Sequence, residues 1–289
     1  MISELNENKL FQTKVHLEVI LKEGFKIIEE NEFSFNIYFS LFKRYIYSFE
    51  SLNLLLLDYD QNKRYREHPI SIVLRAGLLD YLITLYLATY QAQKKSDPRF
   101  KPIYEKEIDK LVSEQIRRYL NVSEKDKQFV HYNQDDHRKD VDMFKKMFSR
   151  LFNPDIPIDY NKPGKSLRYQ QKEDITTTTI RKRLDEVKNG LENIHYQDVF
   201  YLYNLYSKYD HFGTTSMLLE YSDIEIVITN ILGSIFHICE GIGFCIELMI
   251  DEVSCKSDFK ELENRLAQLR GTVYTKTLYL SPEYKERHQ

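Results

Sequence analysis

Two groups of polar residues interrupt apolar helical sequence, and both could take part in chemistry. The first group is Arg75 and Asp80, within the apolar stretch from Ser71 to Tyr86. The second group consists of Asn204, Ser207 and His211. A buried arginine or carboxylate is costly unless it is paired. Such residues therefore indicate either a structural polar network or a functional site.

The second group predicts a polar stripe on one helix. Residues three, four and seven positions apart share a helix face, so Asn204, Ser207 and His211 lie together. His211 could then act as a general base or bind a phosphate, with Ser207 orienting the imidazole. The alternatives are a solvated stripe and a histidine that is hydrogen-bonded in the core.

The first group does not form one ion pair. Arg75 and Asp80 are five residues apart, which is about 140° around a helix. Each therefore needs its own partner. A buried arginine favours a carboxylate, a cluster of carbonyls or a bound anion. Either Arg75 forms a structural salt bridge, or its helix packs so that it lies near His211 or Asp210.

Other residues have the types that bind metals. His237 and Glu240 are three residues apart, and Glu192 with His195 forms a single Glu-x-x-His motif. Di-iron bundles use two such motifs and two further carboxylates. Residues 131–140 are also rich in potential ligands, but they are hydrophilic and favour a solvated loop. The sequence therefore predicts no metal and no other cofactor.

Composition predicts long helices. The 289 residues include only nine glycines and seven prolines, well below average usage. The net charge of −3 excludes a global field that attracts nucleic acid, although a local basic patch is compatible with it. Three cysteines without metal-type spacing and a polar N-terminus indicate reduced thiols in a cytoplasmic protein. Charged residues within 224–250 favour a buried core helix, so no membrane partner is expected.

Apolar periodicity predicts an all-α, multi-helix bundle. Helices are expected over residues 9–30, 33–59, 70–93, 101–119, from a cap at Ser123 to about 152, 179–189, 195–212, 222–253 and 257–269. Residues 153–175 contain three prolines and little apolar periodicity, which predicts a loop or linker. It would join an N-terminal helical part (1–152) to a C-terminal helical part (176–289) within one integrated domain.

The two polar helices carry a resemblance. An apolar helix with Arg75 and Asp80 precedes a helix with Tyr203, Ser207 and His211. This order resembles a family of uncharacterised bacterial helical proteins with an Arg…Asp/Glu helix and a Ser-x-x-x-His helix, which are distantly similar to HEPN-type domains. The resemblance covers residues 70–90 and 201–220.

The resemblance implies a HEPN-like core with additional helices, in a bacterial defence or toxin-type effector. It also implies metal-independent ribonuclease activity, RNA as substrate and a homodimer. HEPN ribonucleases carry Arg-x(4–6)-His on one helix, and no histidine of this chain has that spacing. The site would instead join Arg75 to His211 across helices. The alternative function is a non-catalytic interaction or sensor subunit, with a partner protein of a phage-defence system.

Overall fold

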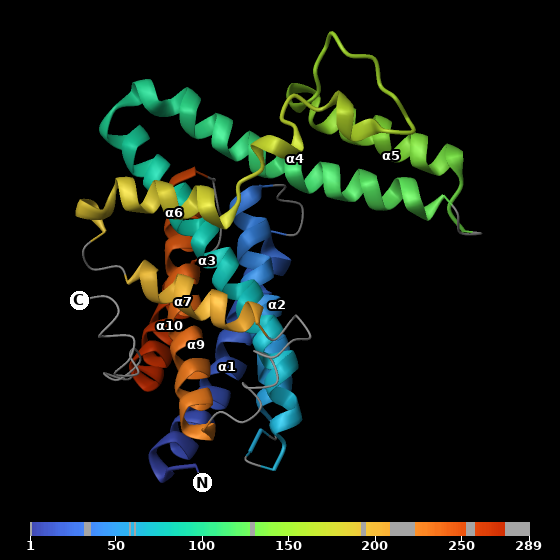
Figure 1. Cartoon of the computed structure of the whole chain (residues 1–289). Coiled ribbons are helices and arrows are strands. Elements are labelled where there is room, and N and C mark those ends of the chain that lie inside the picture. Colours follow the sequence, from blue (N-terminus) through green and yellow to red (C-terminus); the bar gives the residue numbers. More distant parts are fainter. Residues whose placement is uncertain are drawn as a thin grey trace. The chain divides into compact units, whose positions relative to one another are not determined.

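The fold is all-α, as the sequence predicts. The computed structural model describes residues 2–31, 36–57, 59–60, 62–127, 131–191, 195–208, 223–252 and 258–274. These residues form α-helices, short 3-10 turns and one isolated antiparallel bridge between Phe152 and Leu167 (Figure 1). The helices are α1 (Glu4–Glu30), α2 (Ile37–Leu56), α3 (Glu67–Ser96), α4 (Lys101–Asp126), α5 (Gln134–Met147), α6 (Thr177–Glu186), α7 (Tyr196–Ser207), α9 (Ile224–Glu252) and α10 (Lys260–Val273).

The largest difference from the expected helices lies between α4 and α5. Ser123 does not cap a helix, because α4 continues through it to Asp126. The N-cap of α5 is Asn133, whose side-chain oxygen accepts hydrogen bonds from the backbone N–H groups of Asp135 and Asp136. The expectation of a solvated loop over 131–140 is therefore wrong, since α5 begins at Gln134 and runs through most of this segment.

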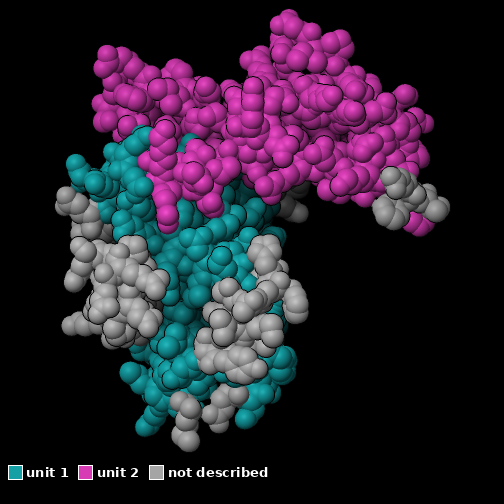
Figure 2. Space-filling model, viewed as in Figure 1, with its two compact units in different colours: residues 1–88, 183–289 teal, residues 89–182 magenta. Residues whose placement is uncertain are grey.

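The described chain divides into two compact units, shown in different colours in Figure 2. Unit 1 comprises residues 1–88 and 183–289, and unit 2 comprises residues 89–182. The chain leaves unit 1 within α3 and returns to it within α6. The separate division expected at residues 152 and 175 stays a prediction.

Unit 1 is a helical bundle in which glycines allow close packing. α1, α2, the first part of α3, α9 and α10 run beside one another (Figure 1). A Cβ atom added to Gly241 of α9 would lie 2.6 Å from the Tyr45 hydroxyl oxygen of α2 and 3.0 Å from the Tyr81 ring of α3. The core is rich in large side chains, including Tyr38, Phe39, Phe42, Tyr45, Phe49, Tyr81 and Tyr86.

Two helical segments of the described residues, 64–96 and 224–252, are long and apolar enough to span a membrane by length and composition. Buried residues make up 67% and 72% of their apolar windows. Helices that are apolar nearly all round are also the central helices of large cores. Their burial therefore fits a core position.

Unit 2 has its own core between α4, α5 and the segment that follows α5. The buried apolar residues are Ile116, Leu120, Val141, Leu151, Phe152 and Leu167. The segment over 153–175 contains no α-helix, but part of it packs against α4. Arg117 of α4 donates a hydrogen bond to the Tyr169 carbonyl at 2.9 Å and a second one to the Asp174 carboxylate. These bonds hold the irregular segment against the helix.

Candidate functional site

Arg75 of α3 reaches the helix that carries the predicted polar stripe. Its guanidinium carbon lies 5.5 Å from the centre of the Tyr203 ring of α7. A cation over an aromatic face at this distance is attracted by the ring quadrupole. α7 is also held by α9, because the Ser234 hydroxyl donates to the Tyr206 hydroxyl oxygen at 3.1 Å. The structure therefore places Arg75 and α7 side by side within unit 1.

The stripe residues on α7 are placed differently from one another. The Ser207 hydroxyl lies 3.1 Å from the Tyr203 carbonyl and 2.9 Å from the Asn204 carbonyl, so its hydrogen is engaged by its own helix. Asn204 is exposed. His211 lies outside the described residues, and so does the predicted proximity of His211 to Arg75. The described half of the candidate site is Arg75, Tyr203, Asn204 and Ser207.

Asp80 faces a different helix from Arg75, in keeping with the 140° between them. Arg44 of α2 donates from Nε to Asp80 Oδ2 at 3.0 Å, and Arg44 Nη2 lies 2.8 Å from Oδ1. The Asp80 side chain is only 1% exposed. Burial raises the pKa of this carboxyl to about 6, although Arg44 opposes the shift. Asp80 therefore belongs to an ion pair between α2 and α3 in which the carboxylate is buried and the Arg44 side chain is half exposed.

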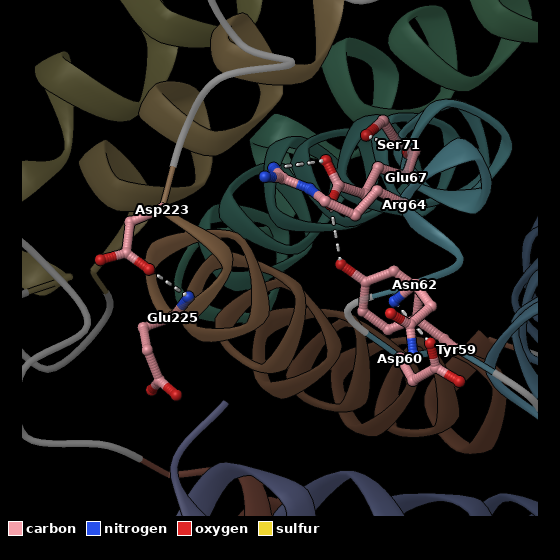
Figure 3. Close-up of polar contacts among 8 residues, drawn as sticks. All are labelled: Tyr59, Asp60, Asn62, Arg64, Glu67, Ser71, Asp223 and Glu225. Atoms are coloured by element: carbon pink, nitrogen blue, oxygen red, sulfur yellow. Dashed lines mark hydrogen bonds and ion pairs between the residues drawn. The ribbon is translucent and has the colours of Figure 1, made fainter. Parts of the chain in front are cut away.

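A further polar cluster lies on α3, one and two turns before Arg75. The Ser71 hydroxyl donates to the Glu67 carbonyl at 2.6 Å. The Glu67 carboxylate accepts bonds from Arg64 Nε at 2.7 Å and from the Tyr59 hydroxyl at 3.1 Å, as Figure 3 shows. The Arg64-x-x-Glu67 spacing was a visible signal for this pair. No sequence spacing indicated the bond between Tyr59 and Glu67, because it depends on how the chain folds back before α3.

His237 and Glu240 of α9 belong to a second polar cluster, which is partly buried. His237 Nδ1 lies 3.2 Å from Glu240 Oε2, which also accepts a bond from the Tyr81 hydroxyl of α3 at 3.3 Å. Arg270 of α10 donates to Glu240 Oε1 at 3.2 Å. Three helices thus share one carboxylate. Sequence reasoning noted His237 and Glu240 but missed Tyr81 and Arg270, because their partners come from other helices.

The second cluster has the properties of a structural network. Within the described residues, no group of three or more His, Cys, Asp or Glu side chains is arranged to hold a metal ion. Burial raises the pKa of Asp198 on α7, and the nearby His237 and His195 oppose the shift. The His237 side chain is 1% exposed. A histidine that is so enclosed is suited to joining helices. The face between α3 and α7 differs, because the exposed Asn204 lies on the same helix as the ring that Arg75 contacts.

Comparison with known proteins identifies no relative: no family model, curated protein or solved structure matches this chain.

Proposed function

We propose that this protein is a defence or toxin-type effector that cleaves RNA without a metal ion, using the face formed by α3 and α7. The observation that supports the proposal is the contact between Arg75 and Tyr203. It brings a cation beside the exposed polar positions of the helix that leads to His211. An arginine next to an aromatic ring is a combination that binds phosphates and stacks on RNA bases.

Each residue has a distinct role in this proposal. Arg75 binds the scissile phosphate and stabilises the negative charge that develops during cleavage. His211, four residues after Ser207, is the general base, and Asn204 and Ser207 orient it. Asp80 acts as a positioning residue, because its pair with Arg44 fixes α3 against α2. The HEPN-like core and the homodimer belong to the same proposal.

The test is expression of the wild type, Arg75→Ala and His211→Ala in bacteria, followed by measurement of growth and total RNA. The wild type is expected to slow growth and fragment RNA, and both variants are expected to lose these effects while remaining folded. Arg118→Ala and His131→Ala remove an exposed arginine and an exposed histidine outside the site, and they should behave like the wild type.

Purified protein gives the second measurement. Cleavage of RNA should persist in a chelator, because the proposed site uses no metal. Intact RNA in all strains, also after phage infection or co-expression of neighbouring genes, would exclude the nuclease. If Arg75→Ala and His211→Ala both remained toxic, the site assignment would be wrong even though the effector function stood.

A specific observation favours a second candidate, a non-catalytic interaction or sensor subunit. The polar groups of Asp80, Ser207 and Glu240 are all bonded within the protein. Polar pairs of this kind can fix helix register without any chemistry. In that case Arg75→Ala would lower the free energy of unfolding and leave cellular RNA unchanged.

A further inference from the structure

Unit 2 contains a chain of four hydrogen-bonded side chains that runs from a half-buried carboxylate to a buried imidazole. The Tyr132 hydroxyl lies 2.5 Å from Asp140 Oδ2. The hydroxyls of Tyr132 and Ser123 are bonded to each other. Ser123 Oγ lies 2.8 Å from Nδ1 of His137, a side chain with no exposed surface. The chain thus joins α4 to α5.

The other ring nitrogen fixes how His137 is protonated. Nε2 lies 2.7 Å from the Tyr160 carbonyl oxygen. A carbonyl oxygen only accepts hydrogen bonds, so Nε2 must carry a hydrogen. A neutral His137 therefore has a bare Nδ1 that can only accept a bond from Ser123.

Counting hydrogens shows that a neutral imidazole and an ionised carboxylate cannot complete the chain of bonds. The three bonds that link Asp140, Tyr132, Ser123 and His137 need three hydrogens, one in each bond. The two hydroxyls carry one hydrogen each. The third must come either from a protonated Nδ1 or from a protonated Asp140 carboxyl. The Tyr119 hydroxyl, 3.1 Å from Asp140 Oδ2, uses its hydrogen in a bond of its own and does not change the count.

We infer that these four residues hold one proton more than a neutral imidazole and a carboxylate would, and that this shared proton latches α5 onto α4. With the proton on His137, all hydrogens point toward Asp140, and with the proton on Asp140 they all point the other way. Both arrangements satisfy every group. Loss of the proton leaves two lone pairs facing each other at one link, which costs one hydrogen bond.

The surroundings of Tyr132 keep its hydroxyl protonated, so that it can relay hydrogen bonds. Burial and the bond to Asp140 raise the pKa of Tyr132 to about 12, and the same causes raise the pKa of Tyr119. Titratable or charged groups among the described residues near these four include Asp126 on α4, Arg138 and Asp142 on α5, and Tyr160. Arg138 lies over the Tyr160 ring, and Asp142 accepts the Tyr160 hydroxyl at 2.8 Å, so both interact outside the chain.

The sign of the pH dependence follows from linkage. The three bonds are complete only when the third hydrogen is present, so the latch contributes most to stability at low pH and least at high pH. Histidine changes charge between about pH 5 and about pH 8, which sets the range to measure.

The test is a double-mutant cycle of Ser123→Ala and Asp140→Asn in the full chain, with denaturant unfolding at both ends of that range. These two residues share no bond, so independent effects would add. The amide N–H introduced by Asp140→Asn supplies the third hydrogen at any pH, so we expect the pair to couple by about tenfold in the folding equilibrium constant at high pH, where the wild type lacks that hydrogen, and by much less at low pH. Asp142→Asn is the matched control on the same helix, and its effect should add to that of Ser123→Ala at both pH values.

Two further measurements cover the case in which Ser123→Ala fails to fold. Tyr132→Phe removes the half-exposed hydroxyl that links Asp140 to Ser123. In this background the effect of Asp140→Asn on the free energy of unfolding should no longer depend on pH through His137. The ¹⁵N shifts of the His137 ring should change with Asp140→Asn in the wild-type background and remain unchanged in Tyr132→Phe. Additive effects at both pH values, or a His137 signal indifferent to Asp140, would overturn the inference.

Discussion

Arg75 of α3 and Tyr203 of α7 lie far apart in the sequence, yet the Arg75 guanidinium carbon lies 5.5 Å from the centre of the Tyr203 ring. This contact fixes which face of α3 meets α7. It also sets the distance over which an arginine on α3 could act on groups carried by α7.

The contact should be measurable as a coupling energy. A cation–π pair contributes about 0.5–2 kcal/mol, depending on how far it is shielded from water. The cycle of Arg75→Ala and Tyr203→Ala, followed by urea unfolding, should therefore give a coupling of that size, and Tyr203→Phe should keep most of it. Strictly additive effects would show that the ring and the cation do not interact in solution.

Asp80 should make stability depend on pH in the direction opposite to most carboxylates. Burial raises its folded-state pKa from 3.8 to about 6, so the folded protein holds this proton more tightly than the unfolded chain. The contribution of Asp80 to the free energy of unfolding is complete below its ordinary pKa of 3.8. It is lost as pH rises through about 6, by roughly 3 kcal/mol in total.

The measurement is the difference in free energy of unfolding between the wild type and Asp80→Asn across this range. Relative to the variant, the wild type should become less stable as pH increases. A difference that does not change with pH would mean that Arg44 fully compensates the burial of the charge.

Gly241 should be intolerant of a side chain, whereas a neighbouring glycine should tolerate one. Gly241→Ala would bring a methyl group to 2.6 Å from the Tyr45 hydroxyl oxygen, and overpacking of this kind costs about 1–3 kcal/mol. Gly243 on the same helix has no atom within 4 Å of an added Cβ.

Gly243→Ala is thus the matched control, and it should stabilise the helix by about 0.5–1 kcal/mol through backbone entropy. Thermal unfolding of both variants checks the pair of outcomes. Equal effects of the two substitutions would contradict the close packing of α9 against α2 and α3.

Glu240 should stabilise the meeting point of α3, α9 and α10. It accepts bonds from Tyr81, His237 and Arg270, and its removal takes away an acceptor that three helices share. We expect Glu240→Ala to lower the free energy of unfolding by about 1–3 kcal/mol. Glu247→Ala, which removes an exposed carboxylate two turns later, serves as the comparison, and similar losses in both variants would refute the role of the cluster.

Local sequence determined most of the helices. The scarcity of glycine and proline, the apolar spacing of three and four, and the breaks at Pro98 and residues 153–175 depend only on neighbouring residues. Helix formation is governed by the same short range, since a helix satisfies its own backbone. The exception was the start of α5, where a capping box at Asn133 had greater effect than the Ser123 position.

Tertiary structure decided which polar residues are joined. Sequence geometry could state that Arg75 and Asp80 need different partners, but it could not supply Arg44, 36 residues before Asp80. It also could not show that His137, in a hydrophilic segment, would be fully buried between Ser123 and the Tyr160 carbonyl. A helix dictates which residues share a face, whereas the partner of that face depends on how separate helices pack, and only the folded bundle sets that packing.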